Sequence, residues 1–213
     1  MTANGDGLKL LGGRQEAYRA RTRASLIKSA HKVLSEVGLG TTIDDLAIQA
    51  QVSPATIYNH FHSKEEYLKE ALEQIWQEWI VWAYDGRPQG GDIETMLDVC
   101  RKMYRINPSH TLIGRVLSKT LRDATFVIDA LRPSATGAFR DAAQKMGLDS
   151  DDFDTRLEMW AHCLVGIFQG VYVTRKLSPE DADKALRVSL SIWGLNKTQA
   201  ERLTSRPIEF SQK

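Results

Sequence analysis

The sequence predicts an all-α protein with an N-terminal three-helix domain and a larger C-terminal helical domain. Apolar residues recur at helical spacing along almost the whole chain after residue 13, and Val, Ile and Thr do not alternate over any long stretch, so strands are not supported. Helix-capping residues then divide the chain into separate helices. We expect a flexible basic arm at residues 1–18, the small domain at 19–65 and the C-terminal domain at 66–213.

The composition is that of an ordinary globular protein. Of the 213 residues, 42% are hydrophobic and 26% are charged, and the formal net charge is +1. Two cysteines are too few for a disulfide scaffold or a cysteine-based zinc site. No apolar run approaches the roughly 20 residues of a membrane span, and the N-terminus lacks the apolar core of a signal peptide. These features predict a cytoplasmic protein with no membrane partner.

The positive charge is concentrated near the N-terminus. Residues 9–32 hold seven Lys or Arg and one Glu, whereas residues 70–213 are nearly neutral. The stretch before residue 14 holds four Gly and no lasting periodicity, which is typical of a flexible arm. A local basic run is the footprint expected of a protein that contacts a polyanion, although a solvated helix face gives the same pattern.

Capping signals place the helices that follow the arm. Thr42 with Asp45, and Ser63 with Glu66, have the spacing of a capping box. The first helix is expected to end at Gly38, so that three short helices precede a long fourth one from about residue 63, with five or six more after it. The other boundary signals are Ser53-Pro54, Pro108-Ser109, Arg132-Pro133, Gly147 and Ser178-Pro179.

Two short helices around a tight turn predict a helix-turn-helix. The first spans residues 42 to about 50, the chain turns at 51–52, and the second spans 53 to about 60. Ile57 and Phe61 must pack the second helix down. That helix can then enter the major groove of DNA, about 12 Å wide, with its N-terminal residues toward the base edges. An ordinary helical corner is the alternative. The outward residues are Pro54, Ala55, Thr56, Tyr58, Asn59 and His60.

The same segment carries a dense residue pattern. Its members are Gly38, Thr41-Thr42-Ile43, Asp45-Leu46-Ala47, Ala50, Val52-Ser53, Thr56-Ile57-Tyr58, His60-Phe61, Ser63-Lys64-Glu65 and Leu68. By this pattern, roughly residues 19–70 resemble the TetR family of bacterial transcriptional regulators, and the remainder agrees only in length and helical character. The chain departs from the family at Gln51, where Gly is common. A non-Gly residue with positive φ costs about 1 kcal/mol, so this departure concerns the turn geometry.

The resemblance implies which residues contact DNA. Thr42, Tyr58, His60 and Lys64 match positions that contact phosphates, and hydroxyls, Lys and a helix N-terminus are good phosphate partners. Our candidates for base edges are Ala55, Thr56 and Asn59, because Asn can bind adenine and methyl groups can meet the thymine methyl. The arm and first helix would add backbone or minor-groove contacts through Arg14, Arg19, Arg21 and Arg23. The full predicted DNA-binding set is Thr42, Ser53, Pro54, Ala55, Thr56, Tyr58, Asn59, His60 and Lys64.

The fourth helix carries an apolar stripe with tryptophans. Leu68, Leu72, Ile75, Trp79 and Trp82 repeat at spacings of 4, 3, 4 and 3. Core packing would explain this stripe. The resemblance favours the wall of an effector cavity, since family members often bind ligands beside this helix and such sites are lined by apolar and aromatic side chains. The expected pocket residues are Trp79, Trp82, Met103, Tyr104 and Phe126, with Met96 and Phe139 as further wall candidates.

The segment from residue 152 to 177 has two apolar stripes, so its helix is expected to be buried on two sides. The bulky stripe is Phe153, Leu157, Trp160, Leu164, Phe168 and Val171. The second stripe is either packing within one domain or half of a dimer interface shared with the helix at 178–193. A two-fold dimer is what a helix-turn-helix needs to read a palindrome. The expected dimer residues are Met159, Cys163, Gly166, Gly170 and Val173.

Motifs for catalysis or metal binding are missing from the sequence. The His and Cys residues are scattered, and the acidic run at 149–154 lacks the Gly and Glu of a calcium loop. There is no Walker A motif and no G-x-S-x-G. We therefore predict no enzyme, no metal and no cofactor.

The function predicted from the sequence is that of a ligand-responsive transcriptional regulator. We expect a repressor that binds a palindromic DNA operator as a homodimer and is released by a small apolar or aromatic effector. The alternatives are an all-α small-molecule-binding or interaction protein, and an enzyme that uses the C-terminal pocket.

Overall fold

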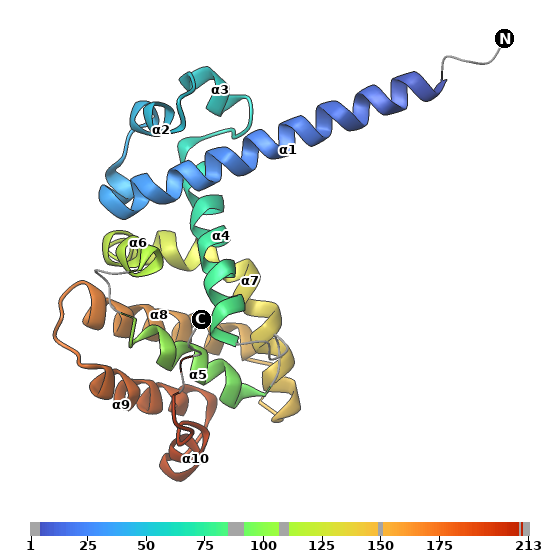
Figure 1. Ribbon diagram of the computed structural model, residues 1–213. Helices are drawn as coiled ribbons and strands as arrows, with labels where there is room; N and C mark the ends of the chain where they lie inside the picture. Colours follow the sequence, from blue (N-terminus) through green and yellow to red (C-terminus); the bar gives the residue numbers. More distant parts are fainter. Residues whose placement is uncertain (1–4, 85–91, 107–110, 149–150, 209, 211–213) are drawn as a thin grey trace.

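The computed structural model describes residues 5–84, 92–106, 111–148, 151–208 and 210, and this part of the chain is helical without strands (Figure 1). Among the described helices, none has the length and apolar content that crossing a membrane requires. The helices are α1 (Gly5–Glu36), η1 (Gly38–Gly40), α2 (Ile43–Ala50), α3 (Pro54–Tyr58), α4 (Lys64–Tyr84), α5 (Ile93–Met103), α6 (Leu112–Thr120), α7 (Ala124–Lys145), α8 (Phe153–Tyr172), α9 (Pro179–Ser189), η2 (Leu190–Trp193) and α10 (Lys197–Leu203).

Four helices, α2, α3, α4 and α9, begin at the capping residues that the sequence predicts. The Thr42 hydroxyl accepts the N–H of Asp45 at 3.1 Å, and the Asp45 carboxylate accepts the N–H of Thr42 at 2.9 Å, which completes the predicted capping box. At α4 only half of the predicted box forms. The Ser63 hydroxyl accepts the N–H of Glu66, but the Glu66 carboxylate accepts the N–H of His62 instead. Ser53-Pro54 starts α3 and Ser178-Pro179 starts α9.

Helix α1 begins earlier than the sequence predicts. Residues 5–18, expected as flexible arm, belong to α1, which is 32 residues long rather than short. The run from Arg14 to Ala20 has no Gly or Pro and is rich in good helix formers, so the helix continues through it at little cost. Every residue of that run is exposed, and Figure 1 shows this end of α1 projecting from the body of the molecule.

Helix α7 continues through Pro133, where the sequence predicts a boundary. A Pro in a helix interior costs about 3 kcal/mol, partly because one backbone hydrogen bond is lost. Pro133 and Asp129, whose carbonyl loses its partner, are both exposed, so solvent can hydrate that carbonyl. Val127 and Ile128 before the Pro, and Phe139 after it, are buried. Core packing on both sides therefore keeps the helix continuous.

The N-terminal domain forms around α1. Leu26 and Ile27 of α1 share one core with Leu46 of α2 and Ile57 of α3. The Tyr67 hydroxyl of α4 donates to the Leu26 carbonyl at 2.5 Å. This bond fixes the start of α4 to α1.

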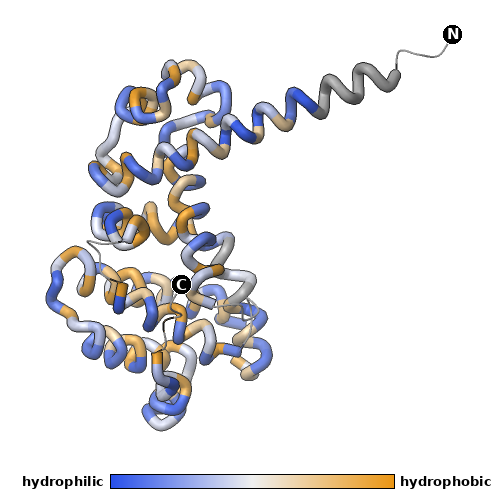
Figure 2. Tube along the Cα trace, in the orientation of Figure 1, coloured by the Kyte–Doolittle hydropathy of each residue, from blue (hydrophilic) through white to orange (hydrophobic). Residues whose placement is uncertain are grey.

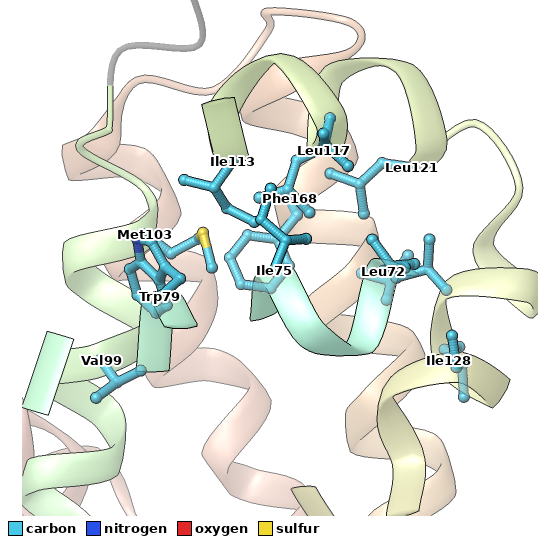
Figure 3. Packing of buried hydrophobic residues seen from close by; sticks show 14 of the residues in the cluster. Leu72, Ile75, Trp79, Val99, Met103, Ile113, Leu117, Leu121, Ile128 and Phe168 are labelled. Atoms are coloured by element: carbon cyan, nitrogen blue, oxygen red, sulfur yellow. The ribbon is translucent and has the colours of Figure 1, made fainter. Parts of the chain in front are cut away.

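Helix α4 connects this domain to the larger helical part of the molecule (Figure 1). It packs on α1, α5, α6 and α7. Figure 3 shows its buried side chains within a cluster to which α5, α6, α7 and α8 also contribute. Hydrophobic and hydrophilic residues are interleaved along nearly every helix, as expected where each helix buries one face (Figure 2).

Candidate DNA-binding surface and ligand cavity

The side chains of α3 divide into a buried and an outward face as the sequence predicts. Ile57 is fully buried and Phe61, just beyond the helix, is 1% exposed. Tyr58 is 52% exposed. Ala55 and Asn59 are also exposed, and the other predicted DNA-facing residues of α3, Pro54 and Thr56, are partly buried. The structure therefore gathers these candidates on one short surface.

The turn between α2 and α3 places Gln51 in the left-handed region, with φ 57° and ψ 42°. Its N–H donates to the Ile48 carbonyl at 3.1 Å, and the N–H of Val52 donates to the Ala47 carbonyl at 3.0 Å. These two bonds form a Schellman motif, which usually has Gly at this position. The departure from the family at Gln51 is therefore accommodated at some cost in strain.

The candidate phosphate contacts lie near helix starts. The Thr42 and Ser53 hydroxyls both cap their helices. The Lys64 ammonium donates to the Thr41 carbonyl at 2.9 Å and so sits between the starts of α2 and α4. Burial lowers the pKa of His60, and the positive charges of two nearby arginines lower it further. His60 is therefore uncharged at neutral pH and can offer a phosphate a hydrogen bond rather than a charge.

The four arginines expected to contact DNA are not equivalent. Arg14 and Arg21 are exposed. Arg19 Nη2 donates to the Asn59 carbonyl at 3.5 Å, at the end of α3. Arg23 is paired inside the domain with Glu66 and Glu70. The guanidinium of Arg23 is therefore engaged within the protein, whereas the side chains of Arg14 and Arg21 are exposed.

A cavity of about 320 Å³ lies in the C-terminal part, between α4, α5, α7 and α8. Five aromatic rings face it, from Trp76, Tyr84, Phe139, Trp160 and Phe168. The remaining walls are Gln77, Ile80, Met96, Val99, Cys100, Val127, Ile128, Leu131, Arg132, Thr136, Asp154, Leu157, Glu158, Ala161, Leu164 and Val165. Such a mixture of aromatic and aliphatic walls with few polar groups is typical of a small-molecule site.

The charged groups in the cavity wall are paired with other side chains. Arg132 Nη1 lies 2.5 Å from Glu158 Oε2 and bridges α7 to α8. Asp154 Oδ1 lies 2.5 Å from Arg140 Nη2. Burial raises the pKa of the Cys100 thiol to about 12, so this wall group is neutral as well. The cavity thus presents little uncompensated charge.

The five residues predicted to line the pocket are elsewhere. Trp79 and Met103 are buried in the cluster of Figure 3, and Tyr104 packs on Phe168 with ring centres 5.1 Å apart. Trp82 is half-exposed beside Phe210, and Phe126 lies under Lys69. The reason is helical phase. Positions 76, 80 and 84 share the cavity face of α4, and Trp79 and Trp82 fall on neighbouring faces. The two further candidates, Met96 and Phe139, do line the cavity.

The two stripes of α8 have different surroundings. In the bulky stripe, Phe153, Trp160 and Phe168 are buried. In the second stripe, Met159 is 55% exposed, and Cys163 and Gly166 are exposed too. The remaining members are partly buried: Val173, and Gly170, on which Leu177 of the same chain packs. On α9, Val188 is 73% exposed. An apolar strip of α8 is therefore left uncovered within one chain.

Residues 26–71 match the family model described as "Bacterial regulatory proteins, tetR family". No curated protein is similar enough in sequence to count as a relative. Solved structures also share the fold, among them the following three. The alignment with RolR in complex with the ligand resorcinol covers 92% of this chain and 100% of the RolR chain, at 19% identity and a TM-score of 0.65. The alignment with RolR without ligand covers 88% of this chain and 100% of the RolR chain, at 19% identity and a TM-score of 0.61. The alignment with a putative TetR-family transcriptional regulator from Rhodococcus sp. covers 81% of this chain and 98% of that regulator, at 19% identity and a TM-score of 0.56.

Proposed function

We propose that this chain, whose residues 26–71 match the model of the tetR family of bacterial regulatory proteins, is a DNA-binding transcriptional regulator that responds to a small ligand. The observation that carries this proposal is the course of α4. The helix starts at Lys64, beside the exposed surface of α3, and further along it lines the aromatic cavity with Trp76 and Ile80. One rigid element therefore touches both sites. The matching family is one of bacterial regulatory proteins, and one of the solved structures with this fold is described as a putative TetR-family transcriptional regulator.

In this proposal, α3 reads the major groove of DNA. Ala55, Thr56 and Asn59 reach base edges, while the remaining members of the set bind phosphates or set the approach of the helix. The phosphate contacts come from Thr42, Tyr58, His60 and Lys64, and Ser53 and Pro54 form the entry of α3. The exposed cations of α1, among them Arg14 and Arg21, strengthen the attraction to the DNA backbone.

A second copy of the chain covers the exposed strip of α8 and α9. Met159, Cys163 and Gly166 form the α8 part, and Val188 forms the α9 part, each of them exposed in one chain. A two-fold pair of helix-turn-helix domains then reads a palindromic operator. Val173 lies at the margin of this face, and Gly170 belongs to the chain's own packing.

The ligand is a neutral aromatic molecule with few polar groups. The rings of Trp76, Phe139, Trp160 and Phe168 offer stacking surfaces. A charged ligand would have to disrupt the Arg132–Glu158 pair to find a partner. RolR was solved with resorcinol, a neutral aromatic compound of this class.

Ligand binding releases the operator. A ligand that binds better to one arrangement of α4 than to another shifts the population toward that arrangement. Since α4 begins beside α3, the shift changes the position of the DNA-reading surface. The protein is then a repressor that its effector removes from the operator.

Selection of duplexes from a random pool, followed by a ligand panel, tests this function. We expect one preferred sequence, and we expect that resorcinol or another substituted phenol weakens binding to it. Ala161→Trp fills the cavity and should abolish the ligand effect while DNA binding remains. Thr198→Trp, which adds the same ring at an exposed site on α10, should keep both. No preferred duplex at low salt would exclude a DNA-binding regulator.

A further inference from the structure

The guanidinium of Arg23 joins three parts of the N-terminal domain. Nε donates to Glu70 at 2.9 Å, and Nη2 donates to the second oxygen of Glu70, with Glu66 3.5 Å away. Nη1 donates to the backbone carbonyl of His60. The guanidinium carbon lies 4.1 Å from the centre of the Phe61 ring. One side chain of α1 therefore holds both the first two turns of α4 and the chain just after α3.

The helical phase of α1 separates Arg23 from the exposed cations of that helix. Arg23 is in register with Ile27, Ala30 and Leu34, all of which are buried. Its own side chain is 33% exposed. The hydrogen bond with Glu70 raises the pKa of Arg23 further, so its charge is permanent. The opposite face of α1 carries the exposed residues Arg14, Arg21, Lys28 and Lys32.

Helix α3 needs an external support of this kind. It has five residues, and an isolated helix of that length is not stable in water. Its N-terminal end is held by the Ser53 cap and its inner face by Ile57. At its C-terminal end, the carbonyls of Asn59 and His60 accept hydrogen bonds from Arg19 and Arg23.

We propose that Arg23 is a positioning residue for sequence reading: it fixes the orientation of α3 against α1 and α4 and does not itself contact DNA. The proposal rests on the proposed DNA-binding function. Four of the five N–H groups of Arg23 are directed at acceptors of the protein, and two carboxylates compensate its charge, so the side chain has little left to offer a phosphate. Its contribution is to geometry, and geometry matters for base edges more than for phosphates.

The test compares affinity for the selected operator with affinity for a scrambled duplex, each over a salt series. Arg23→Ala should lower operator affinity at least about tenfold, because charge-assisted bonds are lost and α3 loosens. Affinity for scrambled DNA should stay within about twofold and the salt slope should not change, since no phosphate contact is removed. Arg21→Ala is the matched exposed cation of α1. It should weaken both duplexes equally and reduce the slope by about 0.9.

Two further variants make the test independent of the folding of Arg23→Ala. Arg23→Lys keeps the charge but loses the fork, and Glu70→Gln removes the charged partner, so each should lower discrimination between the duplexes. The double variant Arg23→Ala/Glu70→Gln should lose no more than Arg23→Ala alone, because both changes remove one shared interaction. Circular dichroism identifies any variant that does not fold, and the folded ones then decide.

Each outcome has a distinct meaning. If Arg23→Ala or Arg23→Lys weakens both duplexes equally and lowers the salt slope, Arg23 is a phosphate contact and the proposal is wrong. If the folded variants discriminate between operator and scrambled duplex as well as the wild type does, Arg23 contributes to folding alone and the proposal is wrong. A wild-type protein that discriminates shows that the proposed function holds even when the Arg23 proposal fails. A wild type without discrimination overturns both.

Discussion

Gln51 holds a left-handed backbone conformation that L side chains adopt at a cost. Its φ of 57° belongs to the Schellman turn that ends α2. Gln51→Gly should therefore raise the free energy of unfolding by about 0.5–1 kcal/mol, the strain relieved being partly offset by the freedom of Gly in the unfolded chain. Urea unfolding measures the change. Gln49→Gly, inside α2, is the control and should lower the free energy of unfolding by about 1 kcal/mol. A lower free energy of unfolding for both variants would show that the backbone of Gln51 is not strained.

His31 links stability to pH. It is buried, and its Nε2 donates to the Ala71 carbonyl at 2.8 Å. Burial lowers the pKa of His31 from its usual value of 6.5. Below that pH the unfolded chain binds a proton that the folded chain excludes, so the stabilising contribution is complete above about pH 6.5 and falls as the pH is lowered. His31→Gln keeps a donor that does not titrate. It should flatten the decline of the unfolding free energy between about pH 7 and 5, and parallel declines in the two proteins would contradict the assignment.

At the residue scale, the sequence was most informative where local rules apply. The caps at Thr42 and Ser53, and the burial of Ile57, follow from spacing and hydrogen-bond chemistry over a few residues. The role of Arg23 depends on Glu70, which is 47 residues away in the chain. Its register with the buried face of α1 was the one signal in the sequence that it points inward, and a count of basic residues conceals that signal.

Pro133 lowers the stability of α7. The residue is exposed, so that its replacement removes no buried contact. Pro133→Ala should raise the free energy of unfolding by about 1–3 kcal/mol, because Ala restores the backbone bond and removes the ring clash. Thermal or urea unfolding measures it. An unchanged or lower stability would mean that Pro133 contributes packing or a bend that α7 needs.

At the element scale, helix type and number were predictable, but some ends and facings were not. Caps and Pro or Gly signals act locally, whereas the continuity of α7 depends on burial of residues on both sides of Pro133. The apolar side chains of α4 lie on more than one face of the helix. Periodicity predicted a single apolar stripe through Trp79 and Trp82, and it could not tell that Trp76 and Ile80 line the cavity while Trp79 is packed in the core. That distinction depends on where α7 and α8 pack.

Substitutions at two glycines of α8 can distinguish the proposed packing between two chains from the packing within one chain. A Cβ at Gly166 would meet no heavy atom of its own chain within 4 Å, whereas a Cβ at Gly170 would lie 2.5 Å from Leu177 Cδ1. Gly166→Leu should therefore fold normally yet shift a dimer toward monomer, because the added side chain overpacks the interface. Gly170→Leu should instead lower the thermal stability of the chain itself. Sedimentation and thermal unfolding distinguish the two effects. A Gly166→Leu protein that stays dimeric would place the interface elsewhere.

At the scale of the whole molecule, the all-α fold and its N-terminal helix-turn-helix were predictable from helical periodicity and from the pattern at residues 37–68. The position of the cavity was not, because four helices from distant parts of the sequence enclose it. The projecting end of α1 was not predicted either. The exposed residues 14–20 have good helix propensity, but they bury no face. The apolar periodicity by which the other helices were predicted is therefore missing from this end of α1.

The coupling of the cavity to the DNA surface through α4 is tested most directly by linkage. Trp76 and Trp160 line the cavity, so tryptophan fluorescence can follow a titration with resorcinol, or with the most effective phenol of the panel, in the absence and presence of saturating operator. Coupling is reciprocal. Operator should weaken ligand binding by the same factor by which ligand weakens operator binding, about 5–150-fold. A ligand that binds the cavity with equal affinity in both titrations would contradict the proposed coupling.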